Sequence, residues 1–119
     1  MNNNMNWYLA KMVFNIDIEN GKHNSQFDEQ LRMIKAENAD EAFFKARAIG
    51  RREEQVFMNT KQKEVNWKFI DVSEIQQLQE FKDGSEIYST THETEEANEY
   101  ISFVKHKAMV IQTESQVFI

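Results

Sequence analysis

The sequence predicts a two-layer α+β domain, in which a mainly antiparallel sheet of four or five strands carries a long helix across one face and a second helix follows at the C-terminal end. Three observations predict this fold. Residues 7–18 place apolar side chains at every second position, as a strand does. Asn20-Gly21 is a strong hairpin-turn signal. Residues 38–55 have the capping and charge pattern of a helix. The expected element order is β-β-α-β-β-α, with a last short strand as an option.

The first hairpin joins residues 7–18 to a second strand at residues 26–36. A two-residue turn at Asn20-Gly21 sets the register, because it leaves one way for the strands to face each other. The facing pairs are then Phe14–Phe27, Ala10–Leu31, Tyr8–Met33 and Met12–Glu29 on one face, and Trp7–Ile34 on the other. If the loop instead runs through residues 22–25, a slip of one residue moves that whole set to the opposite face.

The long helix is the best-specified element. Asn38 is a suitable N-cap, and Glu41, three residues later, completes a pair that resembles a capping box. Asp40 at the start, with Arg51 and Arg52 near the end, complements the helix dipole. We expect Phe43 or Phe44 to anchor the helix. The predicted core packs the helix residues Ala42, Phe43, Ala46 and Ile49 against Tyr8, Ala10, Met12, Phe14, Val65, Trp67 and Phe69.

The rest of the chain is less regular. Residues 56–58 either end the helix or begin a short strand, and residues 65–72 form a strand. Ile75, Leu78 and Phe81 recur at helix-like spacing in a connector, and residues 85–90 follow the Asp83-Gly84 turn as a further strand. Thr94 can cap the second helix, whose apolar stripe is Ala97, Tyr100, Ile101, Val104 and Ala108.

Composition excludes several classes of protein. The 119 residues suit one domain, expected over 7–119 after a disordered lead at 1–6. A net charge of −6 argues against a nucleic-acid binder, and no apolar run is long enough to span a membrane. The chain has no cysteine, its opening residues lack a signal-peptide pattern, and its three histidines lack metal-site spacing. We therefore expect a cytoplasmic protein without metal or cofactor.

Several short motifs occur together in a fixed order. They are Trp7-Tyr8, Lys35-Ala36-Glu37, the helical stretch 41–46, the strand 65–72 and the turn and strand 83–88. In this order they resemble the small bacterial proteins grouped as domain-of-unknown-function family 4288. The resemblance covers roughly residues 7–88, and residues after Thr91 lie outside it. It implies a compact α+β domain in a bacterial cell and no chemistry, because family members carry no established activity.

Glu29 is the residue that most deserves testing as a site. If it points inward, burial would raise its pKa and make it a general acid or base. Alternatively, the register is off by one and Glu29 is exposed, or it pairs with Lys11 or Arg32. With Trp67 and Tyr88 it forms a candidate small-molecule site, for binding or for a minor enzyme activity.

A basic group on the long helix has two interpretations. Lys45, Arg47, Arg51 and Arg52 either contact phosphate or RNA, or form a solvated face balanced by neighbouring glutamates. The second interpretation is favoured, because helices of mixed charge are usually just exposed. No glycine-rich phosphate loop and no nucleophile elbow is present in the sequence.

The function that the sequence predicts is a protein-interaction or regulatory module, and not an enzyme. Apolar residues are left over once the core is assigned, which favours a homodimer or another protein partner. The expected interface comprises Trp7, Leu9, Val13, Ile34, Val117, Phe118 and Ile119.

Overall fold

The computed structural model describes residues 5–21 and 25–117 of the chain. Contacts divide the chain into two compact units, Met1–Tyr88 and Ser89–Ile119, and each is described by itself. A single domain over 7–119 therefore stays a prediction. Asn6 already belongs to the first strand, whereas residues 1–4 of the expected lead lie outside the described residues.

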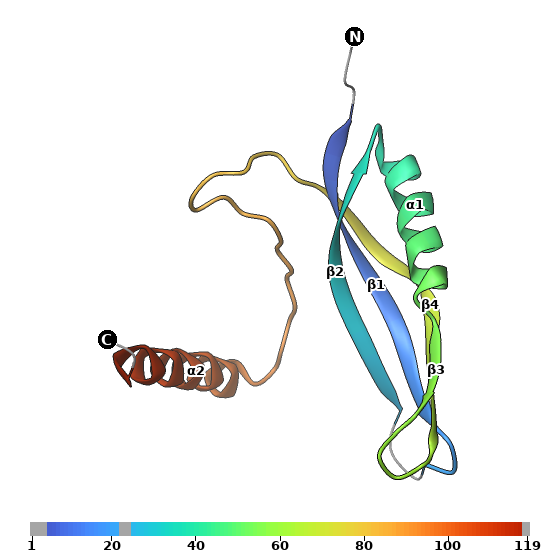
Figure 1. Ribbon diagram of the computed structural model, residues 1–119. Helices are drawn as coiled ribbons and strands as arrows, with labels where there is room; N and C mark the ends of the chain where they lie inside the picture. Colours follow the sequence, from blue (N-terminus) through green and yellow to red (C-terminus); the bar gives the residue numbers. More distant parts are fainter. Residues whose placement is uncertain (1–4, 22–24, 118–119) are drawn as a thin grey trace. The chain divides into compact units, whose positions relative to one another are not determined.

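The first unit is an antiparallel sheet with one helix packed on it (Figure 1). The strands are β1 (Asn6–Ile18), β2 (Gln26–Ala36), β3 (Gln55–Met58) and β4 (Glu64–Gln77), in the spatial order β2-β1-β4-β3. Helix α1 (Ala39–Arg52) joins β2 to β3. With helix α2 (Ala97–Val117) in the second unit, the predicted α+β fold and its β-β-α-β-β-α order are confirmed.

The register of the first hairpin differs by one residue from the one that a two-residue turn gives. The structure pairs Tyr8 with Ile34 and Phe14 with Asp28. Gly21 N–H donates to the Ile18 carbonyl at 2.9 Å, so the tight turn comes before Gly21, and the loop runs on to Ser25. The longer-loop alternative is thus correct. Ile34 faces α1, while Glu29, Leu31 and Met33 lie on the other face, because alternate residues of a strand point to opposite sides.

Helix α1 starts as its capping signals predict. The Asn38 side chain accepts from Glu41 N–H at 2.8 Å, and the Glu41 carboxylate accepts from Glu37 N–H at 3.4 Å. The far end lies very close to the sheet: a Cβ placed on Gly50 would come within 2.5 Å of Cδ1 of Phe69. A side chain at this position would therefore have to displace an aromatic ring of the core.

The core lies between α1 and the β1–β4 region of the sheet. Phe43, Ile49, Trp67 and Ile75 pack at its margin, so Phe43 is the anchor and Phe44 is exposed. Val65 is buried as well. The buried cluster comprises Tyr8, Ala10, Met12, Phe14, Ile34, Ala36, Ala42, Ala46, Phe69 and Val72. The predicted packing of the long helix on the first and fourth strands is confirmed.

Strand β4 is longer than the predicted strand over residues 65–72. It continues to Gln77, so the helix-like connector assigned from Ile75 onwards is wrong at its start. Its pairing with β1 is shifted at two bulges, each of which adds a residue to β4, so Phe69, Val72 and Ile75 face the core three residues apart. That spacing imitates a helix. Residues 85–90 form no strand, and residues 56–58 belong to strand β3.

Side chains continue along the outer edge of β4 beyond Gln55, the first residue of β3. The Glu54 carboxylate accepts from the Phe69 N–H at 2.9 Å, and Arg47 of α1 bonds Asp71 through two nitrogens at 3.0 and 2.9 Å. We call these residues, Arg47, Glu54 and Asp71, the β4 edge cap. Arg47, one of the basic residues of the long helix, therefore forms an ion pair within the protein.

In the second unit, α2 begins at Ala97, two residues later than a helix capped directly by Thr94 would begin. Thr94 Oγ1 accepts from Glu96 N–H at 3.0 Å, and Tyr100 N–H donates to the Glu96 carbonyl at 3.0 Å. Every α2 side chain that the structure describes, residues 97–114, is exposed, including the whole predicted stripe. Neither helix in the described part of the chain combines the length and apolar character needed to cross a membrane.

Candidate functional site

Lys11 is the centre of a polar cluster on the sheet face opposite α1. Its Nζ lies 3.3 Å from Glu29 and 3.4 Å from Glu74. The Tyr88 hydroxyl donates to Glu74 at 2.8 Å, and the Lys11 Nζ is 5.4 Å from the centre of the Tyr88 ring. Strands β2, β1 and β4 lie side by side, so they bring Glu29, Lys11 and Glu74 into one row. We call these four residues the Lys11 cluster.

The cluster favours the ionised forms of Lys11 and Glu74. Hydrogen bonding to Tyr88, and then to Glu29 and Glu74, raises the pKa of Lys11. The Tyr88 hydrogen bond, followed by the Lys11 contact, lowers the pKa of Glu74. A lysine that keeps its proton is a poor nucleophile or base. The cluster therefore joins the segment before Tyr88 to the sheet, and offers little for catalysis.

Glu29 pairs with Lys11, as one of the sequence interpretations had it, and 58% of its side chain is exposed. Trp67 points to the other face, where its ring lies 6.2 Å from that of Phe14. The structure thus brings Glu29 and Tyr88 together through Lys11 and leaves Trp67 on the opposite side of the sheet.

Trp67 instead lines a shallow cavity of about 170 Å³ beyond the end of α1. Arg32 forms one wall of this cavity. Its guanidinium donates to both carboxylate oxygens of Glu53 at 3.1 and 2.5 Å, and to the amide oxygen of Gln30 at 3.1 and 2.7 Å. The lining residues are Phe14, Gln30, Arg32, Glu53, Gln55 and Trp67. The ionised groups are already paired with each other, so the cavity suits a small neutral ligand better than a reaction.

Sequence reasoning missed Arg32 and Glu53 as partners. One signal was available: β2 alternates polar residues with Phe27, Leu31 and Met33, so a shift of one residue turns its polar set toward the helix side. Glu53 directly follows the basic end of α1, and the turn of the chain there brings it to Arg32.

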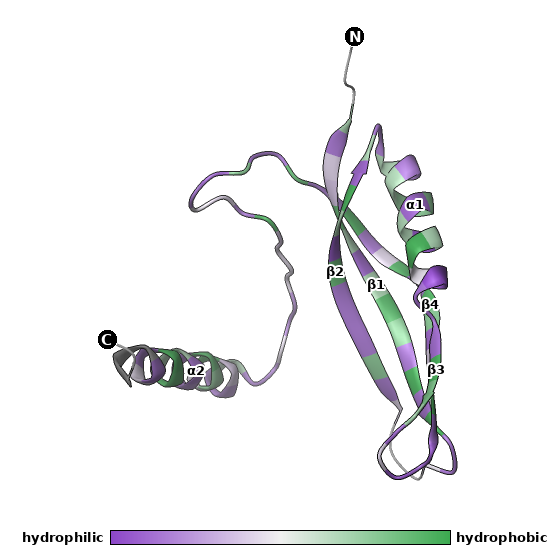
Figure 2. Ribbon diagram, viewed as in Figure 1, coloured by the Kyte–Doolittle hydropathy of each residue, from purple (hydrophilic) through white to green (hydrophobic). Residues whose placement is uncertain are grey.

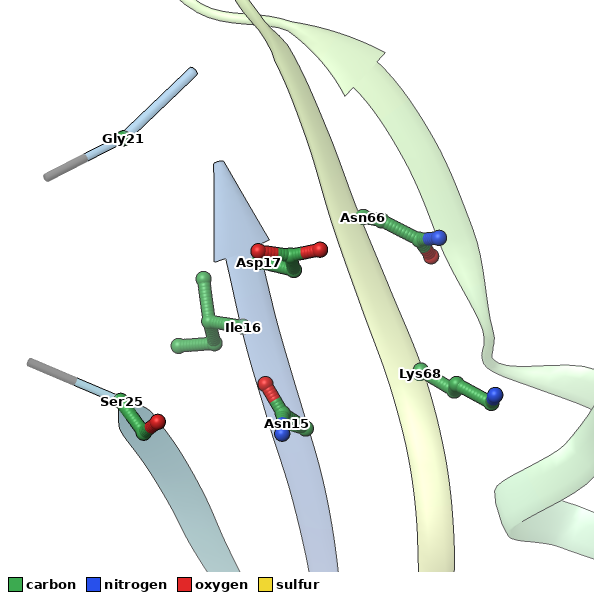
Figure 3. Close-up of a pocket in the computed structure, with 7 residues that line it drawn as sticks. All are labelled: Asn15, Ile16, Asp17, Gly21, Ser25, Asn66 and Lys68. Carbon is green, nitrogen blue, oxygen red and sulfur yellow. The ribbon is translucent and has the colours of Figure 1, made fainter. Parts of the chain in front are cut away.

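A second cavity, of about 440 Å³, lies at the loop end of the first hairpin. Figure 3 shows its polar side chains distributed along β1 and β4 and at the two ends of the loop, without converging on one point. It is lined by Asn15, Ile16, Asp17, Gly21, Ser25, Asn66 and Lys68. Within residues 5–21 and 25–117 there is no group of acidic or histidine side chains that could hold a metal ion.

The residues expected at a dimer interface have different positions. Ile34 is in the core below α1, and Leu9 is buried on the opposite face. Trp7 packs edge-on against Phe81 at 6.4 Å, and its carbonyl accepts from Leu78 N–H at 2.8 Å. Val13 is half-buried. Val117 ends α2, and Phe118 and Ile119 lie outside the described residues.

Comparison with protein-family models matches residues 7–89 to one described as Domain of unknown function (DUF4288). The matched segment ends one residue after the first unit, so α2 lies outside it. Neither the curated proteins nor the solved structures contain a match to the chain.

Proposed function

The chain belongs to this family of unknown function, and we propose that it is a protein-interaction or regulatory module that performs no chemistry of its own. The observation that carries the proposal is α2, a 21-residue helix with an unpacked apolar stripe. The paired state of the ionised groups around Lys11 and Arg32 supports the non-enzymatic part. We place the protein in the bacterial cytoplasm, which a cysteine-free sequence supports.

The α2 stripe has the width of a docking face. At about 100° per residue, its members fall within one arc of about 100°. They are Ala97, Tyr100, Ile101, Val104, Ala108 and Ile111. Its large members, Tyr100, Ile101, Val104 and Ile111, are 44–64% exposed. Helices in proteins gain most of their stability from the packing of an apolar face, so a partner that covers the stripe would also stabilise α2.

Charge adds a requirement for the partner. Acidic residues gather before and within the first turn of α2, whereas Lys105 and Lys107 follow in the middle. A groove that accepts α2 should therefore be apolar along its floor and basic where the helix begins. The acidic residues are Glu93, Glu95, Glu96 and Glu99.

The test compares two double variants of the full chain. Ile101→Asp with Val104→Asp puts charge in the stripe, whereas Ser102→Asp with His106→Asp adds the same charge to the opposite side of α2. Each protein is purified from native lysate, and bound proteins are measured by mass spectrometry. We expect the stripe variant to lose partners that the control retains. Equal recovery with both variants would contradict an α2 docking role.

The cavity beside Trp67 supports a second candidate, a small-molecule-binding domain. Its aromatic wall and side-chain amides suit a small neutral ring that stacks and accepts hydrogen bonds. Mass spectrometry of metabolites carried by the native protein tests it, with Trp67→Ala compared with Trp7→Ala. A metabolite lost only with Trp67→Ala would support this function, and the absence of any bound metabolite would count against it. The residues first grouped as a site, Glu29, Trp67 and Tyr88, would then act separately.

A further inference from the structure

Strand β2 forms an open edge of the sheet. It pairs with β1 alone, and the spatial order places no strand on its other side. Among the described residues, the side-chain bond to its backbone is that of Lys45 Nζ to the Lys35 carbonyl, at 2.9 Å near one end. From Phe27 to Ile34 the outward backbone groups have neither a strand nor a side-chain cap in the described part of the chain. An edge of this kind is a template for strand pairing.

We propose that β2 pairs antiparallel with β2 of a second copy of the chain, with Gln30 opposite Gln30 on the two-fold axis. The two four-stranded sheets would then continue into one. An axis perpendicular to the sheet keeps α1 of both copies on the same face, so residues of the same parity face each other. The resulting pairs are Phe27–Met33, Asp28–Arg32 and Glu29–Leu31, each formed twice.

Charge selects this register among its neighbours. A register centred on Glu29 or on Arg32 would place like charges opposite each other, which is destabilising. One centred on Leu31 would place Asp28 opposite Ile34. Centring on Gln30 instead puts a carboxylate opposite a guanidinium at both ends of the contact.

The atoms needed for that ion pair can still form a hydrogen bond. Asp28 accepts from the Gln30 amide through Oδ2 at 2.5 Å, and its Oδ1 has no partner among the described residues. Arg32 uses its Nε–H, both Nη2 hydrogens and one Nη1 hydrogen on Gln30 and Glu53. One Nη1 hydrogen remains for Asp28 of the second copy. The Glu53 and Gln30 bonds hold the guanidinium in place beforehand, so little side-chain entropy is lost on pairing.

The face away from α1 would also gain apolar contacts. Phe27, Leu31 and Met33 are 55%, 46% and 52% exposed, and they lie along β2 on that face. In the proposed register the Phe27 ring lies opposite Met33 of the second copy, and cross-strand pairs of this kind stabilise sheets. Figure 2 shows that β2 is otherwise mostly hydrophilic, so its apolar side chains are interrupted by polar ones along the edge.

The first test is the oligomeric state of the full chain by sedimentation over a wide range of concentration. We expect a dimer. Asp28→Arg places two arginines opposite each other twice and should weaken association by at least about tenfold. Asp17→Arg, on the inner strand β1, makes the same change of charge and should leave association unchanged. A chain that is monomeric at every concentration, or a dimer that Asp28→Arg does not weaken, overturns the proposal.

A charge swap makes the test specific. A second chain carries Arg32→Asp, with Glu53→Lys to keep an ion pair within the protomer, and its melting temperature shows that it folds. Neither this chain nor Asp28→Arg should dimerise alone, yet a mixture of the two should form heterodimers, because both cross-strand pairs become attractive. A mixture that stays monomeric while both chains are folded contradicts the proposed pairing.

The register is read by cross-linking, because the chain has no native cysteine. Paired strands bring opposite Cα atoms within the reach of a disulfide. Gln30→Cys should cross-link to itself on oxidation, and Phe27→Cys to Met33→Cys but not to itself. The opposite pattern overturns the register. The second unit carries the proposed function and is unchanged here, so failure of the α2 test leaves this one intact.

Discussion

Both edges of the sheet carry backbone groups that could pair with a further strand, but the two edges are covered differently. On the β4 side, the short strand β3 covers the first part of the edge, and the β4 edge cap closes the next part. On the β2 side, the backbone is free from Phe27 to Ile34 among the described residues. One edge is therefore covered by other parts of the chain. The other edge carries charged side chains, among them Asp28, Glu29 and Arg32, along a strand whose outward backbone groups are unpaired among the described residues.

The difference follows from where α1 connects. Helix α1 follows β2, crosses one face of the sheet and leads into β3. Glu54 lies between the end of α1 and the start of β3, so its carboxylate reaches the β4 edge. Among the described residues of the first unit, no segment returns to β2 in the same way, apart from Lys45 at one end. The edge beside the helix exit is thus capped by the connection itself, whereas the edge strand at the start of the connection is not capped in this way among the described residues.

The largest expected effect comes from removing the ring of Phe69, whose backbone N–H binds the β4 edge cap. Phe69 packs between Phe14 and Gly50, with its ring 5.5 Å from that of Phe14. Phe69→Ala should lower the free energy of unfolding by about 3–5 kcal/mol. Urea denaturation measures this, with Phe81→Ala as a control of the same size at an exposed site. Equal losses for the two variants would contradict the central position of Phe69.

A smaller effect is expected from opening the cap itself. Glu54→Ala leaves the Phe69 N–H without its side-chain acceptor and should cost about 1 kcal/mol. Glu54→Gln keeps an acceptor oxygen and serves as the control. We also expect hydrogen exchange at the Phe69 amide to accelerate in the alanine variant. Unchanged exchange would show that the cap does not protect this edge.

Acid should weaken the capped edge further. The hydrogen bond from Arg47, then that from Val72 N–H, lowers the pKa of Asp71 below its ordinary 3.8. The unfolded state therefore binds a proton at higher pH than the folded state does. The resulting stability is present above pH 3.8 and is lost as the pH falls through the folded-state pKa. Asp71→Asn should flatten this acid loss in urea midpoints measured across pH, and an unchanged slope would exclude Asp71 as its source.

The smallest effect is expected on the open side. Glu29→Gln removes the exposed ion pair with Lys11 and should leave the urea midpoint within error, because surface ion pairs contribute little. A clear loss of stability would mean that the Lys11 cluster supports β2 more than its exposure indicates. Glu74→Gln in the same cluster is the companion measurement, since Glu74 also binds Tyr88.

Local signals in the sequence predicted most of the fold. Asn38 and Glu41 located the start of α1, and the alternation in residues 7–18 and 26–36 located the first two strands. The hairpin register was open because it depends on the loop that runs from Gly21 to Ser25, which no local pattern specifies. The bulges in β4 were hidden because their effect, Phe69, Val72 and Ile75 three residues apart, has the period of a helix.

The candidate site was less predictable for the same reason. Glu29 and Tyr88 were selected as unusual residues, and they meet only because Lys11 lies between them on β1. Arg32 and Glu53 are ordinary charged residues in sequence, and their two-nitrogen contact depends on the register and on the exit of α1 together. Long-range pairings of this kind have no signature in a single sequence.

The order β2-β1-β4-β3 also determines how the first unit must fold. The two outer pairs, β1–β2 and β3–β4, are hairpins of neighbouring segments and can form within microseconds. The central pair β1–β4 joins segments separated by the whole of β2, α1 and β3, so its loop-closure entropy is paid before its contacts form. We therefore expect the docking of the two hairpins to limit the folding rate. During synthesis on the ribosome, β1 can pair with β2 early, but its second partner, β4, is the last strand of this unit to be made.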